Sequence, residues 1–288
     1  MNLFGTIETR HSARTFNGLK PDETILDNLI IECNRLSNRN NLPACFSTTD
    51  LPQIMIVDTD AEDRLGTYGV VKGARTYATM GYAQTHDAML LAGFIFEKFI
   101  LYCTANGINT CWIGGTFSQN DFRRAISHSS AQEIFPVGII SPLGHSTQKT
   151  RFAERMMRRF AKSNSRKPFD KLFTGIDAPS DALLANAGED LKAMRSLESC
   201  VKIALEMVRL APSSRNCQPW RAIVVRQDSN IISVDFRCIT DNKFSDIDMG
   251  IALCHFFDSM NALGQYGNII LNTEKSRGAF SWIPELNR

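Results

Sequence analysis

The stretch LAPSSRNCQPW, residues 210–220, lies between a segment with a helical pattern and a segment with a strand pattern. Two prolines, Pro212 and Pro219, restrict the backbone on either side of a group of short polar side chains. That group consists of Ser213, Ser214, Asn216 and Gln218, and the large aromatic Trp220 follows it. The stretch is either a turn that ends a helix or a stiff polar cradle for a ligand, and the rest of the chain must distinguish the two.

The segments on either side of this stretch have counterparts earlier in the chain. LESCVKIALEMVRL (197–210) has the apolar spacing of a helix and precedes the strand-like RAIVV (221–225). In the same order, ILDNLIIECNRL (25–36) precedes the strand-like LPQIMIVD (51–58). Two Met-Gly pairs, Met80-Gly81 and Met249-Gly250, each run into a long apolar helix pattern that ends in glycine. This repeated order predicts a degenerate tandem duplication.

A Gly-, Ala- and Asp-rich segment around residues 175–190 is typical of a joint between two halves. We therefore divide the chain into a first half, residues 1–175, and a shorter second half, residues 176–288. Within each half the pattern predicts helices alternating with short strands, which is an α+β organisation.

The composition is that of a soluble globular protein, with 43% hydrophobic and 22% charged residues among 288. The net charge of +2 indicates no overall attraction to nucleic acid or to a membrane surface. No uninterrupted apolar run reaches about 18 residues, so no membrane span is expected. The polar, acid-containing start of the chain is unlike a signal peptide, and we expect a cytoplasmic protein.

Eight cysteines and five histidines give no sign of a disulfide framework or a metal site. No Cys-x-x-Cys pair occurs, and several cysteines lie inside apolar helix or strand patterns, which favours buried free thiols. The histidines show no ligand spacing among themselves or with the cysteines, so no metal is expected.

One segment is strongly basic: KTRFAERMMRRFAKSNSRK, residues 149–167, carries eight Lys or Arg and one acid. A solvated helix face followed by a loop explains most of these charges. The alternatives are local attraction of a phosphorylated ligand, a nucleic-acid arm, or a basic helix that docks a partner.

Three further stretches could carry chemistry. In RHSARTF (10–16), an extended backbone would project Arg10, Ser12 and Arg14 on one side, which suits a phosphate, although a charged tail is the plainer interpretation. In GINTCWIGG (107–115), the glycines would let the backbone approach a flat ligand, or they form a turn anchored by Trp112. RKPF (166–169) places a basic pair before a proline at a predicted helix start.

Taken together and in this order, these stretches resemble the FMN-dependent nitroreductase family. The matching motifs are R-x-S-x-R-x-F (10–16), G-x-x-T-C-W-I-G-G (107–115), V-G-I-I-S-P-L-G (137–144), R-K-P (166–168) and APSSRNCQPW (211–220). DMGIALCHF (248–256) is similar to the start of that family's long central helix. The first half has only a degenerate counterpart of the APSSRN loop, near SNRNNLPA (37–44), and the second half lacks the other motifs. The chain therefore resembles the subgroup in which two half-domains are fused into an internal pseudo-dimer.

The resemblance implies a nitroreductase-like α+β fold with mixed or antiparallel sheets, and with the long helices 82–106 and 251–266 at its centre. It also implies one composite FMN site. The residues that it places there are Arg10, His11, Ser12, Arg14, Trp112, Ile113, Gly114, Gly115, Arg166, Lys167, Pro212, Ser213, Ser214 and Asn216. His11 could equally be an exposed loop residue, and Gln218 could only brace its loop.

By the same resemblance, NADH or NADPH would donate hydride to flavin N5 and leave, and a nitroaromatic, quinone or enone acceptor would then take its place. The flavin carries the chemistry, so no side chain is expected as a catalytic nucleophile, and Arg14 is the candidate cation beside N1 and O2 of the reduced flavin. The alternative is a flavin-binding or flavin-storage protein without turnover. An internal pseudo-dimer favours a monomer, with a homodimer as the alternative.

Overall fold

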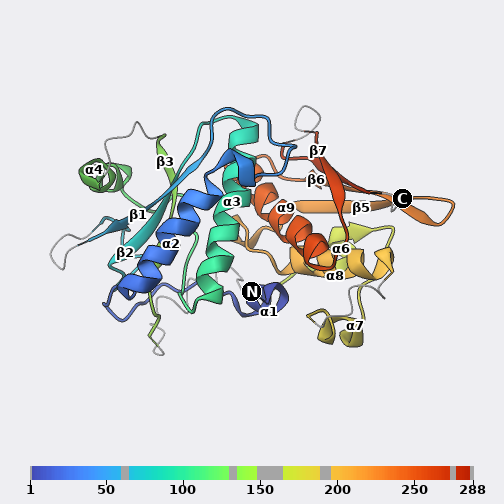
Figure 1. Cartoon of the computed structure of the whole chain (residues 1–288), viewed down its shortest axis with the longest axis horizontal. Helices are drawn as coiled ribbons and strands as arrows, with labels where there is room; N and C mark the ends of the chain where they lie inside the picture. Colours follow the sequence, from blue (N-terminus) through green and yellow to red (C-terminus); the bar gives the residue numbers. More distant parts are fainter. Residues whose placement is uncertain are drawn as a thin grey trace.

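A computed structural model describes residues 2–59, 65–129, 135–147, 165–188, 196–272 and 277–285. Most of the basic segment 149–167 lies outside these described residues, so its interpretations stay as stated. Within them the chain forms two β-sheets with helices packed around both, an α+β fold (Figure 1).

The first sheet is antiparallel and comes entirely from the first half. Its strands, in spatial order, are β1 (Gln53–Asp58), β2 (Thr76–Gly81) and β3 (Val137–Leu143). Every residue of β2 is buried, as expected for the central strand of a small sheet. The predicted strand at 51–58 and the strand within 133–144 are both present.

The second sheet is mixed and has the order β4-β5-β6-β8-β7. Its strands are β4 (Phe173–Thr174), β5 (Trp220–Gln227), β6 (Asn230–Cys238), β7 (Gly267–Leu271) and β8 (Phe280–Pro284). The short β4 pairs in parallel with β5, whereas the other pairs are antiparallel. Because β4 precedes residue 175, the first half as we divided it contributes an edge strand to the second sheet.

The helices at 23–36, 86–105 and 197–210 lie close to the predicted ranges, whereas the helix expected at 251–266 spans 245–262 and the short helix at 181–185 was not predicted. The described helices are α1 (Leu3–Thr9), α2 (Glu23–Leu36), α3 (His86–Ala105), α4 (Gln119–Ser129), α6 (Phe169–Leu172), α7 (Asp181–Ala185), α8 (Leu197–Leu210) and α9 (Ser245–Ala262), with short 3₁₀ turns η1 (Arg39–Asn41) and η3 (Ser214–Asn216). Thr85 caps α3 by accepting from the Ala88 amide, and Gly107, at φ 74°, follows its end.

The two long helices α3 and α9 pack against each other between the two sheets (Figure 1). Both are buried on nearly all sides, which explains their uniformly apolar sequences. They approach closely because Gly93 faces the Ile247 carbonyl and Gly250 faces the Leu90 carbonyl, so a Cβ at either glycine would collide with backbone. The pseudo-dimer expected from the repeated order therefore has this helix pair at its centre.

Helix α3 is long and apolar enough to cross a membrane by length and composition alone, but 78% of that segment is buried inside the protein. Its apolar surface is thus used in the core that it shares with α9 and the first sheet.

The structure corrects one feature of the proposed repeat. Met80-Gly81 ends strand β2, and α3 begins only at His86, whereas Met249-Gly250 lies inside α9. The two Met-Gly pairs are therefore not structurally equivalent. Helix α1 and strands β2, β6, β7 and β8 were not anticipated from the pattern.

Candidate ligand-binding cavity

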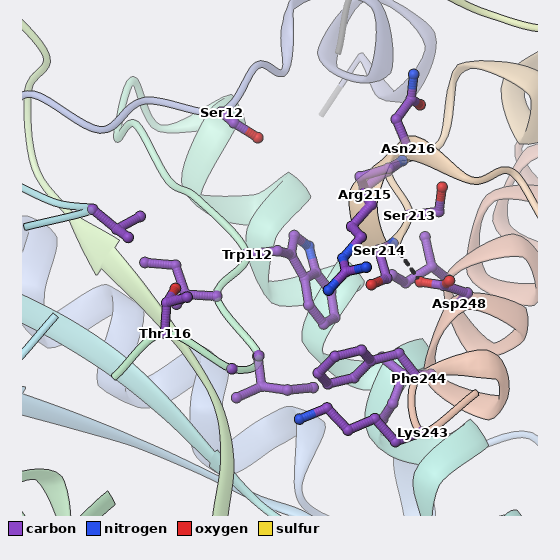
Figure 2. Close-up of a pocket in the computed structure, with 18 of the residues that line it drawn as sticks. Ser12, Trp112, Thr116, Ser213, Ser214, Arg215, Asn216, Lys243, Phe244 and Asp248 are labelled. Atoms are coloured by element: carbon purple, nitrogen blue, oxygen red, sulfur yellow. Dashed lines mark hydrogen bonds between the residues drawn. The ribbon is translucent and has the colours of Figure 1, made fainter. Parts of the chain in front are cut away.

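A cavity of about 390 Å³ lies between the two halves and is lined by both (Figure 2). This size is within the range of small-molecule and cofactor sites. From the first half come Arg10, Ser12, Arg14, Val70, Trp112, Ile113, Gly114, Gly115, Thr116, Ile139 and Arg166. From the second half come Pro212, Ser213, Ser214, Arg215, Asn216, Lys243, Phe244, Ile247, Asp248 and Ile251.

The N-terminal arm after α1 is pinned in an extended form. Ser12 bridges in parallel to Thr110, and the Ala13 amide donates to the Thr110 carbonyl at 2.9 Å. Ala13 is buried on one side of this arm, while Arg10, Ser12 and Arg14 reach the cavity from the other. The alternation expected of an extended segment therefore holds here.

The segment 107–115 runs beside this arm, lines the cavity with residues 112–115 and is anchored in the core. The Ile113 backbone exchanges hydrogen bonds with Ile140 of β3, at 3.0 and 2.9 Å. The Trp112 indole packs edge-on against Phe96 and donates its N–H to Glu97 at 2.8 Å. Trp112 thus lines the cavity with one part and is fixed by α3 with the other.

Glu97 also joins the two central helices. Its other oxygen lies 2.9 Å from Nε2 of His255 on α9, and both side chains are completely buried. Nδ1 of His255 lies 2.9 Å from the Met207 carbonyl on α8 and must donate to it. A single proton between Nε2 of His255 and the Glu97 carboxyl then forms the hydrogen bond between these two groups. Because this chain of contacts leads from α8 through α9 and α3 to Trp112, the cavity wall is tied to the second half.

The loop 211–220 has an unusual backbone conformation and is held by hydrogen bonds. Arg215, Asn216 and Gln218 have positive φ values of 50°, 54° and 45°. Such values are uncommon outside glycine and persist where the surroundings hold them. The Ser214 amide donates to Asp248 at 2.8 Å, and the Gln218 amide donates to the Ser213 hydroxyl at 2.9 Å.

Residues before α6 hold this loop from the first half. Oε1 of the buried Gln218 accepts from the Lys167 amide at 2.8 Å, and the Lys167 ammonium donates to the Cys217 carbonyl at 2.6 Å. Arg166 donates to Asn216 at 3.1 Å and to the Leu210 carbonyl at 2.9 Å. Gln218 therefore braces the loop, and Lys167 does the same from the other half.

One end of the cavity is strongly cationic. Burial lowers the pKa of Arg166 to about 10, and the neighbouring Arg10 and Arg209 guanidiniums add to this lowering. Nη1 of Arg10 and both Nε and Nη1 of Arg14 are buried atoms without a hydrogen-bond partner among the described residues. Because unsatisfied buried donors are costly, this arrangement is typical of a site for an anion.

Among the described residues that line the cavity, Asp248 is the only acid. Its burial raises its pKa to about 7, while the hydrogen bonds from the Ser214 amide and the Cys217 thiol oppose this rise. Near neutral pH it therefore exists in both protonation states.

Twelve of the fourteen residues expected at a flavin site line this cavity. His11 does not: it is exposed, and its Nδ1 lies 3.2 Å from the Thr9 carbonyl, because the alternation of the extended arm turns it away. Lys167 also does not line the cavity, because its ammonium donates to the Cys217 and Gln218 carbonyls of the 211–220 loop. The degenerate counterpart at 37–44 also contributes no lining residue.

Nine lining residues were not anticipated: Val70, Thr116, Ile139, Arg215, Lys243, Phe244, Ile247, Asp248 and Ile251. Asp248 could have been found from the DMGIALCHF motif, and Arg215 from its place inside the APSSRN loop. Lys243 and Phe244 carry no motif, and the four aliphatic residues resemble any other core position in the sequence.

Among the described residues, no group of three or more His, Cys, Asp or Glu side chains could hold a metal ion. All eight cysteines are free thiols.

Comparison with known proteins places this architecture in context. Residues 2–259 match the model of the family described as "Putative TM nitroreductase". A solved structure from Thermotoga maritima, described as a putative nitroreductase, is 20% identical, with 98% of this chain and 94% of that chain covered and a TM-score of 0.57. This similarity shows a shared fold. A comparison with curated proteins gives no match.

Two further solved structures match about half of this chain. A nitroreductase family protein from Clostridium novyi is 17% identical, with 51% of this chain and 87% of that chain covered and a TM-score of 0.38. A nitroreductase with bound FMN from Bacteroides fragilis is 15% identical, with 52% and 91% covered and a TM-score of 0.39.

Proposed function

The chain belongs to the nitroreductase family whose model matches residues 2–259, and from this premise we propose that it is an FMN-dependent NAD(P)H oxidoreductase. Its substrates would be a reduced nicotinamide and a small organic acceptor such as a nitroaromatic, quinone or enone. Its eight free thiols agree with a reducing, cytoplasmic setting.

The observation that supports this proposal most directly is the cationic end of the cavity. Arg10 lies close enough to Arg166 to lower its pKa, and Arg14 lines the same cavity. Arg10 and Arg14 present buried N–H groups without a partner among the described residues. A phosphate monoester carries about −1.5 to −2 charges and three acceptor oxygens, and guanidiniums bind it through paired hydrogen bonds. The Ser12 hydroxyl lines the same cavity (Figure 2). The FMN phosphate would therefore satisfy groups that are otherwise costly to bury.

The rest of the cavity suits a flat ring system. Gly115 leaves backbone open to the cavity, with only the Lys243 ammonium near its missing Cβ, while the Phe244 ring covers Gly114. Ile139, Ile247 and Ile251 supply apolar contact. Ser213 and Ser214 place short polar side chains on the side of the second half. We assign the ring to this region because glycine backbone and apolar walls favour close approach of a planar molecule.

When bound, FMN would supply the redox chemistry: NAD(P)H and one proton are consumed, NAD(P)⁺ leaves, and the acceptor gains two electrons and two protons. The protein's own contribution is to bind, orient and neutralise. Arg14 would place a positive charge beside the ring, where it favours an anionic reduced form. The strained 211–220 loop would hold the polar groups of the second half in a fixed position.

The absorption spectrum of the purified protein tests the proposal. Peaks at roughly 370 and 450 nm would establish a bound oxidised flavin, and their loss on anaerobic addition of NADPH or NADH would establish an oxidoreductase. Peaks that persist with both nicotinamides would instead favour a flavin-storage protein. A colourless protein that takes up no added FMN would contradict both.

A further inference from the structure

The cavity carries more positive charge than one FMN can neutralise. Its described lining contains five cationic residues, Arg10, Arg14, Arg166, Arg215 and Lys243, against the single acid Asp248. A phosphate monoester contributes about −2 charges at most. Even with Asp248 ionised, an excess of about +2 remains, and the two second-half cations, Arg215 and Lys243, are exposed at the rim of the cavity.

Two of the five cations come from the second half and lie apart from the N-terminal arm. Figure 2 shows the Arg215 side chain extending from the 211–220 loop past Trp112 in the direction of Phe244. Arg10 and Arg166 instead lie together at the end where Arg166 donates to Asn216. The left-handed backbone of Arg215 (φ 50°, ψ 24°) directs its side chain into the cavity. Arg215 forms no salt bridge with any described residue.

Lys243 lies on the other side of the Phe244 ring from Arg215 (Figure 2). Its ammonium lies 4.7 Å from the centre of the Phe244 ring, a favourable cation–π distance. The same nitrogen is 3.6 Å from where a Cβ on Gly115 would stand, and the Phe244 ring packs directly on Gly114. Lys243 also forms no salt bridge with a described residue. A cation and an aromatic ring therefore adjoin the glycine pair that we assign to the flavin ring.

From this arrangement we propose that Arg215 and Lys243 form a second anion-binding subsite, for a negatively charged substituent on the planar substrate that reacts with the flavin. The inference rests on the proposed function, because it assigns the glycine-lined region to the ring. A carboxylate, sulfonate or phosphate group would be bound at the rim by these two cations while Phe244 contacts the aromatic part. The anion can belong to the electron acceptor or to the phosphates of the nicotinamide donor.

Matched pairs of probes separate these two sources. For the acceptor, we would compare 1,4-naphthoquinone-2-sulfonate with the neutral 2-methyl-1,4-naphthoquinone, taking the ratio of their kcat/KM values. For the donor, we would follow anaerobic bleaching at 450 nm by NADPH, NADH and the neutral N-benzyl-1,4-dihydronicotinamide. The variants are Lys243→Gln and Arg215→Gln, with Lys171→Gln as control, because Lys171 is exposed on α6 and lines no part of the cavity.

Two ratios are compared: kcat/KM for the sulfonated quinone over the neutral quinone, and the bleaching rate with NADPH or NADH over the rate with the neutral dihydronicotinamide. Each cavity variant should lower one of these ratios about fivefold or more, while Lys171→Gln leaves both unchanged. A change in the quinone pair assigns the anion to the acceptor, and a change in the nicotinamide pair assigns it to the donor. In the parent protein the affected ratio should also fall with added salt.

The proposed function and this inference fail differently. If the variants retain FMN and keep both ratios at the parent values, the second subsite is wrong while the flavoenzyme stands. If the parent protein takes up no FMN, the proposed function is wrong and the subsite falls with it.

Discussion

At the scale of single residues, Asp248 and the cavity arginines present opposite problems of burial. The arginines are charged groups that need an anion, whereas Asp248 is a carboxyl whose charge is costly where it lies. Its pKa is raised to about 7 by burial, despite the hydrogen bond from Ser214. The same cavity therefore favours binding of an external anion and disfavours the ionised form of Asp248.

The pH dependence of stability follows from the raised pKa of Asp248. In the unfolded chain this carboxyl ionises near pH 4, and in the folded protein near pH 7. Between these values the folded state binds more protons, so its contribution to the free energy of unfolding falls as pH rises and levels off above about pH 7. Relative to Asp248→Asn, the parent should lose up to about 4 kcal/mol across this range. Urea unfolding at pH 4 and pH 8 measures most of this difference, and parallel changes in the free energy of unfolding of the two proteins would contradict it.

Arg14 gives a second residue-scale prediction. Arg14→Ala should weaken FMN retention or slow flavin reduction, because it removes buried donors and a positive charge from the cavity. Flavin content after gel filtration and the rate of bleaching at 450 nm are the measurements. Arg123, an exposed residue of α4 away from the cavity, offers Arg123→Ala as a matched control. An Arg14→Ala protein that holds FMN and reduces at the parent rate would remove Arg14 from the site.

At the scale of elements, the crossing of α3 and α9 determines how the two halves meet. Gly93 and Gly250 let the helices approach until backbone touches backbone. The buried contact between Glu97 and His255 links the same two helices and fixes Trp112 at the cavity wall. Close backbone packing and a buried polar network thus both stabilise the interface between α3 and α9.

Gly250→Ala should destabilise the protein, because its Cβ would meet the Leu90 carbonyl and the Phe94 amide in a rigid helix pair. Overpacking of this kind costs about 1–3 kcal/mol. Gly188→Ala is the control, since its Cβ would find only ordinary contact with the Asn2 side chain and should change stability by less than about 0.5 kcal/mol. Equal free energies of unfolding for the two variants would mean that the helix crossing tolerates a methyl group.

Glu97→Leu should cost about 3 kcal/mol or more, because it leaves His255 and the Trp112 indole without their buried partner. Glu198 provides the comparison: its ion pairs with Lys202 and Arg226 lie at the surface and Glu198 itself is 43% exposed, so Glu198→Leu should cost less than about 1 kcal/mol. Chemical denaturation of both variants gives the two values. A small effect at Glu97 would show that the interior rearranges around the lost carboxyl.

At the scale of the whole molecule, the two halves together build one cavity within one chain. The central helices cover each other within one chain, and residues of both halves line the cavity. We therefore expect a monomer of 32.2 kDa that binds one FMN.

Sedimentation equilibrium of the flavin-loaded protein should give that single mass, and flavin absorbance against protein concentration should give a ratio near one. Added FMN should raise the melting temperature with its concentration, because it binds only the folded state. A species of twice the mass would favour the homodimer alternative. A ratio near two would mean that each half holds its own flavin.

The sequence by itself determined the elements that depend on local pattern and the motifs that depend on fixed spacing. The helices at 23–36, 86–105 and 197–210 follow from apolar periodicity and end signals, and the arm 10–14 follows from its alternation, whereas the helix expected at 251–266 begins at Ser245 and ends at Ala262. The restricted backbone on either side of the 211–220 polar group follows from the rings of Pro212 and Pro219. These features are readable because residues within a few positions of each other cause them.

Only the tertiary structure decided which residues from distant segments share the cavity. Lys243 and Phe244 reach it because α9 crosses α3 and brings its start against Gly114 and Gly115, a contact across about 130 positions. The exclusion of Lys167 depends on carbonyls of a loop 50 residues away. The two Met-Gly pairs look alike in sequence but differ in structure. Met80-Gly81 pairs with β1 and β3 as part of a strand, whereas Gly250 lies in a helix that packs against α3. Long-range pairing and packing have no local signal, so they could not be predicted from the residues alone.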